Sequence, residues 1–190
     1  GTLTSAEIRL ARSLNAAGGD DPRASRLGAI AATLGGDRGA MDAALVAGVA
    51  DAAKGWTSIE RRAFDYTRRL GSVLASGSEG ALLIVDATPE AVLALCISSR
   101  NGDAIAAMDA AARAAALGRV TTLAEAGQRA FAVASRAWTG ESHELADADE
   151  AGLVFEGLCA FEDPPKPTAK AAIARLAAAG IRLKILSGDD

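Results

Sequence analysis

The stretch Leu70–Val85, LGSVLASGSEGALLIV, has the clearest strand pattern in the chain. Two apolar runs, Leu70–Ser76 and Ala81–Val85, flank the short segment Gly77-Ser78-Glu79-Gly80. Glycines and small polar residues between two strand-like runs are typical of a tight turn. The stretch therefore predicts a β-hairpin.

Helix-like and strand-like segments occur on both sides of this hairpin. Apolar residues recur at helical spacing in Arg23–Leu34, Met41–Ala53, Glu90–Ser98, Ala104–Leu117 and Pro167–Ala179. Further strand-like runs are Thr57–Ala63, Arg129–Arg136, Leu153–Phe161 and Ile181–Leu186. Loops are expected at Gly18–Pro22 and Trp138–Glu150. The chain is therefore expected to combine helices and strands.

The last forty or so residues follow a different order of elements. After the helix Pro167–Ala179, the run Ile181–Leu186 ends in Ser187 and Gly188. A helix followed by a buried strand is half of a doubly wound α/β unit, in which ligands bind beyond the carboxyl ends of the strands. A hydroxyl and backbone N–H groups at that place suit a phosphate, although Ser-Gly is also a common turn.

Composition excludes several classes of protein. The chain has 190 residues, 50% of them hydrophobic, and a net charge of −4, which argues against a nucleic-acid-binding surface. No apolar run reaches the roughly 18–20 residues of a membrane helix. Two cysteines and the single His143 predict neither a disulfide framework nor a metal site. Because the chain begins at Gly1 and stops just after an apolar run, we expect a segment of a longer protein.

Four blocks of sequence, taken in order, resemble the cytoplasmic part of P-type ATPases. Gly1–Thr4 (GTLT) resembles the end of the DKTGTLT motif, and Gly39–Leu45 (GAMDAAL) resembles a helix with an acid before small and apolar residues. Phe64–Val73 (FDYTRRLGSV) resembles the FDFxRRRxSVV block. Phe161–Asp189 resembles the DPP(K/R)…AGIxxxxxTGD block. Within the family, the FDY-x-RR block is most similar to the bacterial magnesium-transporting branch.

The resemblance implies an α+β fold with a twisted antiparallel sheet flanked by helices. Residues 7–162 would form the nucleotide-binding (N) domain. Residues 1–6, which follow the DKT motif, and residues 163–190, which hold the hinge, would be pieces of the phosphorylation (P) domain. That P domain is expected to be a partial α/β, Rossmann-like fold of the haloacid-dehalogenase type.

The resemblance also implies which residues bind a nucleotide. Phe64 would stack on adenine, and the Asp42 carboxylate would accept a hydrogen bond from the adenine amino group. Arg129 would reach the ATP phosphates, Arg68 is a second phosphate candidate, and Lys166 would contact phosphates when the domains close. Each also has a plain structural interpretation: a core aromatic residue, an acid at a helix N-terminus or a solvated surface charge.

Asp86 departs from the family pattern. The family has Lys-Gly-Ala-Pro-Glu where this chain has Asp86-Ala87-Thr88-Pro89-Glu90. A carboxylate thus replaces the ammonium that would line the adenosine pocket, and losing one charge-assisted contact costs about 1.5–3 kcal/mol. We therefore expect ATP binding in the millimolar range or below detection.

Four further residues are expected to contact phosphate in the P domain. Thr2 lies just after the DKT motif, and Ser187, Gly188 and Asp189 match the family's TGD with the hydroxyl kept. The Asp that the family phosphorylates is not among the 190 residues, so we expect no catalytic residue in this chain and no ATP hydrolysis by it alone.

The function that the resemblance implies is delivery of ATP, as Mg-ATP, to the phosphorylatable Asp of a cation pump. The expected partners are ATP and the remaining P, A and membrane domains of the same protein, with no nucleic acid. The expected place is the cytoplasmic portion of an inner-membrane protein, and magnesium import is the expected transport. The alternatives are a haloacid-dehalogenase-type phosphatase with an inserted cap and a degenerate regulatory N domain that binds no nucleotide.

Overall fold

A computed structural model of the chain describes residues 4–5, 7–36, 39–65, 67–140, 144–164, 166–182 and 184. The contacts divide the chain into two compact units. The larger unit is Ile8–Glu162, and the smaller one combines Gly1–Glu7 with Asp163–Asp190. In the smaller unit the Ser5 N–H donates to the Pro164 carbonyl at 2.9 Å, which joins its two segments.

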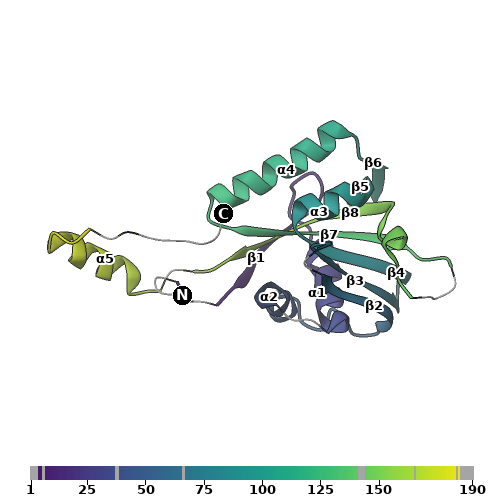
Figure 1. Ribbon diagram of the computed structural model, residues 1–190, viewed down its shortest axis with the longest axis horizontal. Coiled ribbons are helices and arrows are strands. Elements are labelled where there is room, and N and C mark those ends of the chain that lie inside the picture. The colour runs from purple at the N-terminus through teal and green to yellow at the C-terminus, as the bar shows by residue number, and fades with distance from the viewer. Residues whose placement is uncertain are drawn as a thin grey trace. The chain divides into compact units, whose positions relative to one another are not determined.

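The larger unit contains all the strands and most of the helices (Figure 1). Its helices are α1 (Arg23–Gly35), α2 (Ala40–Gly48), α3 (Pro89–Leu95), α4 (Ala110–Glu125) and the short 3-10 helix η1 (Asp147–Glu150). Its strands are β1 (Arg9–Leu14), β2 (Thr57–Asp65), β3 (Leu70–Gly77), β4 (Gly80–Ala87), β5 (Cys96–Asn101), β6 (Ala104–Ala107), β7 (Arg129–Ala137) and β8 (Leu153–Glu162). The smaller unit holds α5 (Ala169–Ala178).

The strands form one sheet with helices on both faces (Figure 1). The order is β2-β3-β4-β7-β8-β5-β6, and β1 also pairs with β8. One apolar core, which includes Leu27, Ile30 and Leu45, packs α1 and α2 against one face. A second core, which includes Leu93 and Leu123, packs α3 and α4 against the other. Two cores on opposite faces explain why the central strands β4, β7 and β8 are mostly apolar.

Strand β8 pairs with three other strands of the sheet. One of its edges pairs with β7, and the other edge pairs with β5 near its start and with β1 near its end. Gly157 lies at the change of partner, has φ +145°, and a Cβ there would collide with the Leu14 carbonyl. Only glycine tolerates both the backbone angle and the close approach.

The predicted hairpin of residues 70–85 is confirmed. β3 and β4 pair antiparallel in a continuous register from Leu70↔Ala87 to Gly77↔Gly80. Ser78 and Glu79 form the two-residue turn, and Gly80 after it has φ +85°. The local pattern sufficed here because the turn and both strands lie within one short segment.

The prediction of helix over Glu90–Ser98 and Ala104–Leu117 is partly wrong. The structure forms strands β5 and β6 between two shorter helices, and the Asn101–Ala104 pair closes a tight hairpin. Gly102 and Asp103 form the turn, and Gly102 has the positive φ of +59° that the first residue of such a two-residue turn requires. Helix α4 begins after Asp109, whose carboxylate accepts a hydrogen bond from the Ala112 N–H at 2.8 Å. The alanine-rich composition concealed this turn and cap.

Three other expectations also differ from the structure. The helix expected over Met41–Ala53 ends at Gly48, which packs against Leu10 of the unpredicted strand β1. The loop expected over Trp138–Glu150 contains η1. The sheet is mixed and not wholly antiparallel, because β5 and β8 pair in parallel. Between these two strands the chain forms β6, α4, β7 and η1, a connection long enough for a parallel crossover.

Ile181 and Arg182 have no regular structure, so the strand expected at Ile181–Leu186 is absent at these two residues. The rest of that segment lies outside the described residues, apart from Lys184, which also has no regular structure. The α/β unit expected at this end is therefore represented by α5 alone.

Candidate functional site

A cavity of about 460 Å³ opens on the α1–α2 face of the sheet, beside β2. Three predicted site residues line it: Asp42 from α2, Phe64 from β2 and Asp86 from β4. The remaining lining is mostly alanine and glycine, with Arg62, Ser72, Val73 and Phe131. This size and this apolar lining with a few polar groups are typical of a small-molecule site.

Asp42 caps a helix and also lines the cavity. It lies in the first turn of α2, and its Oδ2 accepts a hydrogen bond from the Gly39 N–H at 2.9 Å. This bond satisfies a backbone donor at the start of the helix. The same residue lines the cavity, so the cap also holds the carboxylate at the cavity wall.

Phe64 lies in a β-bulge at the edge of the sheet. Arg62 pairs with Ser72 and Asp65 pairs with Leu70, so Ala63 and Phe64 together oppose the single residue Gly71. A bulge redirects side chains and is frequent beside binding sites. The Phe64 side chain lines the cavity and is 44% exposed, which is unusual for a residue that would serve only as core.

Asp86 lies on β4 and carries an unusual charge state for a carboxylate. Burial, together with the charge of Asp42, raises the pKa of Asp86 to about 7. Among the described residues no salt bridge to Asp86 is formed that would offset this burial. Near neutral pH the cavity therefore contains a carboxyl group that is ionised only in part.

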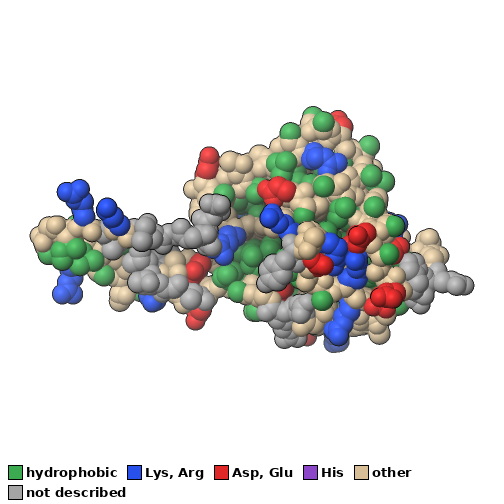
Figure 2. Space-filling model, viewed as in Figure 1, with side chains coloured by type: hydrophobic (Ala, Val, Ile, Leu, Met, Phe, Trp, Pro, Cys, Tyr) green, Lys and Arg blue, Asp and Glu red, His purple; other side chains and the backbone are tan. Residues whose placement is uncertain are grey.

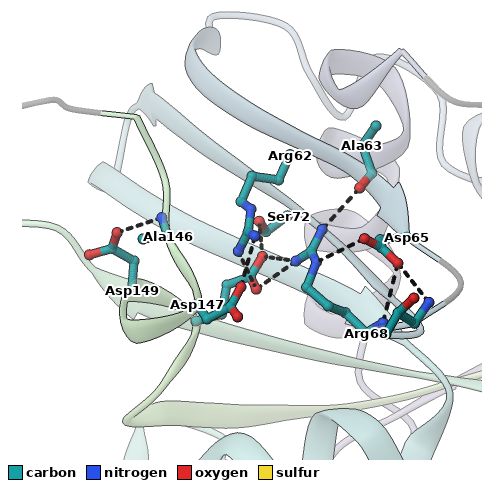
Figure 3. Close-up of polar contacts among 10 residues, drawn as sticks. Arg62, Ala63, Asp65, Arg68, Ser72, Ala146, Asp147 and Asp149 are labelled. Atoms are coloured by element: carbon teal, nitrogen blue, oxygen red, sulfur yellow. Dashed lines mark hydrogen bonds and ion pairs between the residues drawn. The ribbon is translucent and has the colours of Figure 1, made fainter.

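A cluster of charged side chains lies next to the cavity, where β2 and β3 meet η1 (Figure 3). The buried Glu150 carboxylate accepts hydrogen bonds from Arg62 Nη1 at 2.9 Å, Arg68 Nη1 at 2.6 Å and Ser72 Oγ at 2.6 Å. These four residues are called the Glu150 cluster below. Arg68, which was expected to contact phosphate, is thus bound to a buried carboxylate.

A second buried carboxylate has a similar set of partners near the start of α1. Glu156 accepts hydrogen bonds from Arg23 Nε at 2.7 Å, Arg100 Nε at 2.9 Å and Ser135 Oγ at 2.6 Å. These four residues are called the Glu156 cluster, and none of them lines the cavity. Figure 2 likewise shows acidic and basic side chains next to one another on the face that it draws.

The other predicted site residues are not brought to the cavity wall. Arg129 is exposed at the start of β7, two residues before Phe131, and alternate residues of a strand share a face. Lys166 belongs to the smaller unit. The predicted P-domain contacts Thr2, Ser187, Gly188 and Asp189 lie outside the described residues.

Sequence reasoning missed Glu150 and Arg62, both of which lie beside the cavity. Glu150 contacts Arg62, Arg68 and Ser72, and its separation from them is 78 to 88 residues. The one local signal was an acidic segment, Asp147–Glu150, directly before an apolar strand. Such a segment normally indicates a solvated loop, so its buried end could not be recognised.

The described residues form neither a cluster of metal-binding side chains nor a helix that could span a membrane. No group of three His, Cys, Asp or Glu side chains in them is arranged to hold a metal ion. No helix formed by the described residues has the length and apolar character to cross a bilayer.

Comparison with known proteins gives a consistent set of relatives. A family model described as P-type ATPase, cytoplasmic domain N, matches residues 27–168. The Magnesium-transporting ATPase, P-type 1 of Escherichia coli strain K12 is 36% identical over 137 residues, which cover 70% of this chain and 15% of that protein.

Two further relatives extend this set. The protein of the same name from Salmonella typhimurium strain LT2 is 30% identical over 200 residues, covering 100% of this chain and 22% of that protein. The Calcium-transporting ATPase 3, endoplasmic reticulum-type, of Arabidopsis thaliana is 28% identical over 129 residues, covering 67% and 13%. The chain thus spans less than a quarter of the length of these relatives.

Proposed function

The chain belongs to the P-type ATPase family, in which it corresponds to the cytoplasmic domain N, and from this premise we propose that its cavity binds the nucleoside part of ATP. The observation that supports this most is that Asp42, Phe64 and Asp86, from three separate elements, line one cavity of about 460 Å³. An exposed aromatic ring suits the flat face of adenine. A carboxylate suits its amino group, which donates hydrogen bonds.

For the phosphate end of ATP we propose Arg129. Its guanidinium could donate two parallel hydrogen bonds to phosphate oxygens. In the complete protein, Lys166 and the P-domain residues Thr2, Ser187, Gly188 and Asp189 would contact phosphate as well. This part of the proposal rests on the family resemblance of those residues.

The wider proposal concerns the whole protein. Residues 1–6 and 163–190 would be pieces of a P domain of haloacid-dehalogenase type, and residues 7–162 the inserted N domain. ATP would enter as Mg-ATP and phosphorylate an Asp outside these 190 residues. This reaction would drive cation transport, and the cation would be magnesium, carried into the cell. The partners would be the P, A and membrane domains of the same protein, at the cytoplasmic side of an inner membrane. This chain alone would not hydrolyse ATP.

A titration of the 190-residue chain with ATP, followed by NMR chemical shifts, tests the proposal. We expect millimolar affinity, with the shifts centred on the cavity. Phe64→Ala and Arg129→Ala should each weaken binding. If neither substitution changes the affinity, the proposed site is wrong, and a micromolar affinity of the unaltered chain would contradict the expected effect of Asp86.

Asp86 also favours a second candidate function, a regulatory N domain that no longer binds nucleotide. An ionised carboxylate in the cavity repels phosphate and replaces a lysine of the family pattern. The substitution Asp86→Lys separates the two candidates. Millimolar binding by the unaltered chain supports the first, whereas binding that appears only in Asp86→Lys supports the second. The family match favours both over a soluble phosphatase with an inserted cap.

A further inference from the structure

Glu150 makes contacts that a structural loop residue does not need. It ends the short helix η1, is 3% exposed, and is reached by side chains from β2, β3 and the turn between them. Figure 3 shows these side chains converging from the edge of the sheet. All three partners lie within eleven residues of one another in sequence, and Phe64 lies between the first two.

Arg68 links Glu150 to the backbone beside Phe64. Its Nη1 donates to Glu150 and its Nη2 donates to the Ala63 carbonyl at 3.2 Å (Figure 3). Ala63 is in the bulge, outside the paired positions of β2 and β3. A carbonyl released from the ladder by a bulge needs another donor. Arg68 supplies that donor, and Glu150 holds Arg68 in place.

The turn before β3 keeps Arg68 at this position. Asp65 Oδ1 accepts a hydrogen bond from the Thr67 N–H at 2.6 Å, and Arg69 has φ +57°. A residue other than glycine rarely adopts that angle unless its surroundings impose it. Without the Glu150 carboxylate, two guanidinium groups, Arg62 and Arg68, would face each other without a shared counter-charge, and their repulsion would open this turn.

We propose that Glu150 is a positioning residue for nucleotide binding: it holds Arg68 against the Ala63 carbonyl and so fixes the bulge that presents Phe64 to the cavity. This inference rests on the proposed function. Arg68 then acts on the ligand only through the backbone and does not contact phosphate. Since Phe64 would contact the base, loss of Glu150 affects the nucleoside part of the ligand.

This assignment predicts equal losses for ligands with and without phosphates. Glu150→Gln and Arg68→Ala should each weaken binding of adenosine and of ATP by about tenfold, which corresponds to 1.4 kcal/mol. The ratio of the two affinities should stay as in the unaltered chain. If Arg68 contacted phosphate directly, Arg68→Ala would weaken ATP binding and leave adenosine binding unchanged.

The experiment is an NMR titration of the 190-residue chain with adenosine and, separately, with ATP, at concentrations reaching the millimolar range. The matched control is Glu156→Gln, which removes the same charge from a buried carboxylate with the same kinds of partner, away from the cavity. It should lower stability without changing either affinity. The amide shifts of Ala63 and Phe64 should move in Glu150→Gln without ligand and stay in place in Glu156→Gln.

Three outcomes would overturn the inference: unchanged affinities in Glu150→Gln, a loss confined to ATP in Arg68→Ala, or an equal loss of affinity in Glu156→Gln. If Glu150→Gln does not fold, Ser72→Ala, which keeps a small side chain at this cavity-lining position, removes one hydrogen bond to Glu150 and leaves the charges of Glu150, Arg62 and Arg68 in place. It should weaken both ligands by about threefold, or 0.65 kcal/mol, and no weakening would overturn the inference. Failure of the unaltered chain and of Asp86→Lys to bind either ligand would instead contradict the proposed function.

Discussion

Glu150 and Glu156 lie six positions apart in sequence and have the same kinds of partner, yet they serve different parts of the molecule. Each buried carboxylate binds two arginines and one serine hydroxyl, and both serine contacts measure 2.6 Å. The partners of Glu156 come from α1 and from β5 and β7, the two strands on either side of β8. The partners of Glu150 come from the edge strand β2, the turn after it and β3.

The difference teaches that local chemistry and functional role can be separated in this molecule. A buried ion pair contributes little net stability compared with apolar residues of the same size, but breaking one is costly because a buried charge loses its partner. Both clusters should therefore resist substitution to a similar degree. Only the Glu150 cluster is next to the cavity, so only its loss should change ligand binding.

The largest effect on stability is expected at Gly157, which follows Glu156 and lies where the partner of β8 changes from β5 to β1. A Cβ there would collide with the Leu14 carbonyl, and φ is +145°. We expect Gly157→Ala to lower the free energy of unfolding by about 4 kcal/mol, because strain and a backbone clash combine. Urea unfolding followed by circular dichroism measures this.

Gly118 is the matched control for that substitution. It lies in α4, where an added Cβ meets no atom within 4 Å. Gly118→Ala should therefore stabilise the chain by roughly 0.4–1 kcal/mol. If Gly157→Ala lowers the free energy of unfolding by less than about 1 kcal/mol, β8 can shift to relieve the clash. The sheet around β8 would then be no more rigid than its edge strand β2.

The next effect compares the two serines directly. Ser72→Ala and Ser135→Ala each remove a buried hydroxyl that donates to a carboxylate. Each should cost about 1.5–2 kcal/mol of unfolding free energy, since the hydrogen bond is to a charged group. Unfolding curves that differ by more than 1 kcal/mol between the two variants would contradict the view that the clusters are chemically alike.

Asp86 extends the comparison to a carboxylate that forms no salt bridge with any arginine in the described part of the chain. Its folded-state pKa of about 7 lies above the roughly 4 of an unfolded chain. The contribution of Asp86 to the free energy of unfolding is therefore fully present below pH 4, and it is lost as the pH rises through 7. Asp86→Asn should remove this loss. The measurement is the change in unfolding free energy between pH 5 and pH 8, determined for each of the two chains and compared.

The same group should make ATP binding pH-dependent. Repulsion between ionised Asp86 and a phosphate is about 0.7 kcal/mol for charges ~8 Å apart in a largely solvated site, so affinity should rise about threefold from pH 8 to pH 5.5. Asp86→Asn should reduce this change, because no carboxylate titrates at that position. Equal pH dependence in both chains would show that another group is responsible.

The smallest effect is expected at the rim of the Glu150 cluster. Asp147 accepts a hydrogen bond from Arg62 Nη2 at 2.8 Å, but its side chain is 81% exposed. Solvent screening makes such pairs weak. Asp147→Asn should change the unfolding free energy by less than about 0.5 kcal/mol, and it should leave adenosine affinity unchanged. A larger effect on affinity would extend the positioning role beyond the buried carboxylate.

Sequence patterns predicted the parts of this fold that depend on neighbouring residues. The hairpin of β3 and β4, helix α1 and strands β7 and β8 all appear where apolar spacing placed them. Strand β1 was missed because its polar and apolar residues do not alternate regularly and the strand depends on pairing with β8, almost 150 residues away. The turn at Gly102 and Asp103 was readable, but the alanine-rich stretch that follows it, from Ala104 on, favoured a helix instead.

The candidate site divides in the same way. Motif blocks identified Asp42, Phe64 and Asp86, which the fold brings to one cavity. They could not indicate that Arg68 is bound to Glu150, because that contact joins segments 82 residues apart. The charge of Asp86 was visible in the sequence, whereas its raised pKa depends on burial and on Asp42, both of which arise only in the folded chain.

The pairing of three strands with β8 has a consequence for how the protein is made. A ribosome adds about 5–20 residues per second, so β1 leaves it many seconds before its partner, the last strand of the larger unit, is synthesised. Strands β5 and β7 wait for that strand too. Until then their free edges could pair with other nascent chains. The sheet can therefore be completed only after β8 has left the ribosome, and truncation before residue 153 would leave three strands without their shared partner.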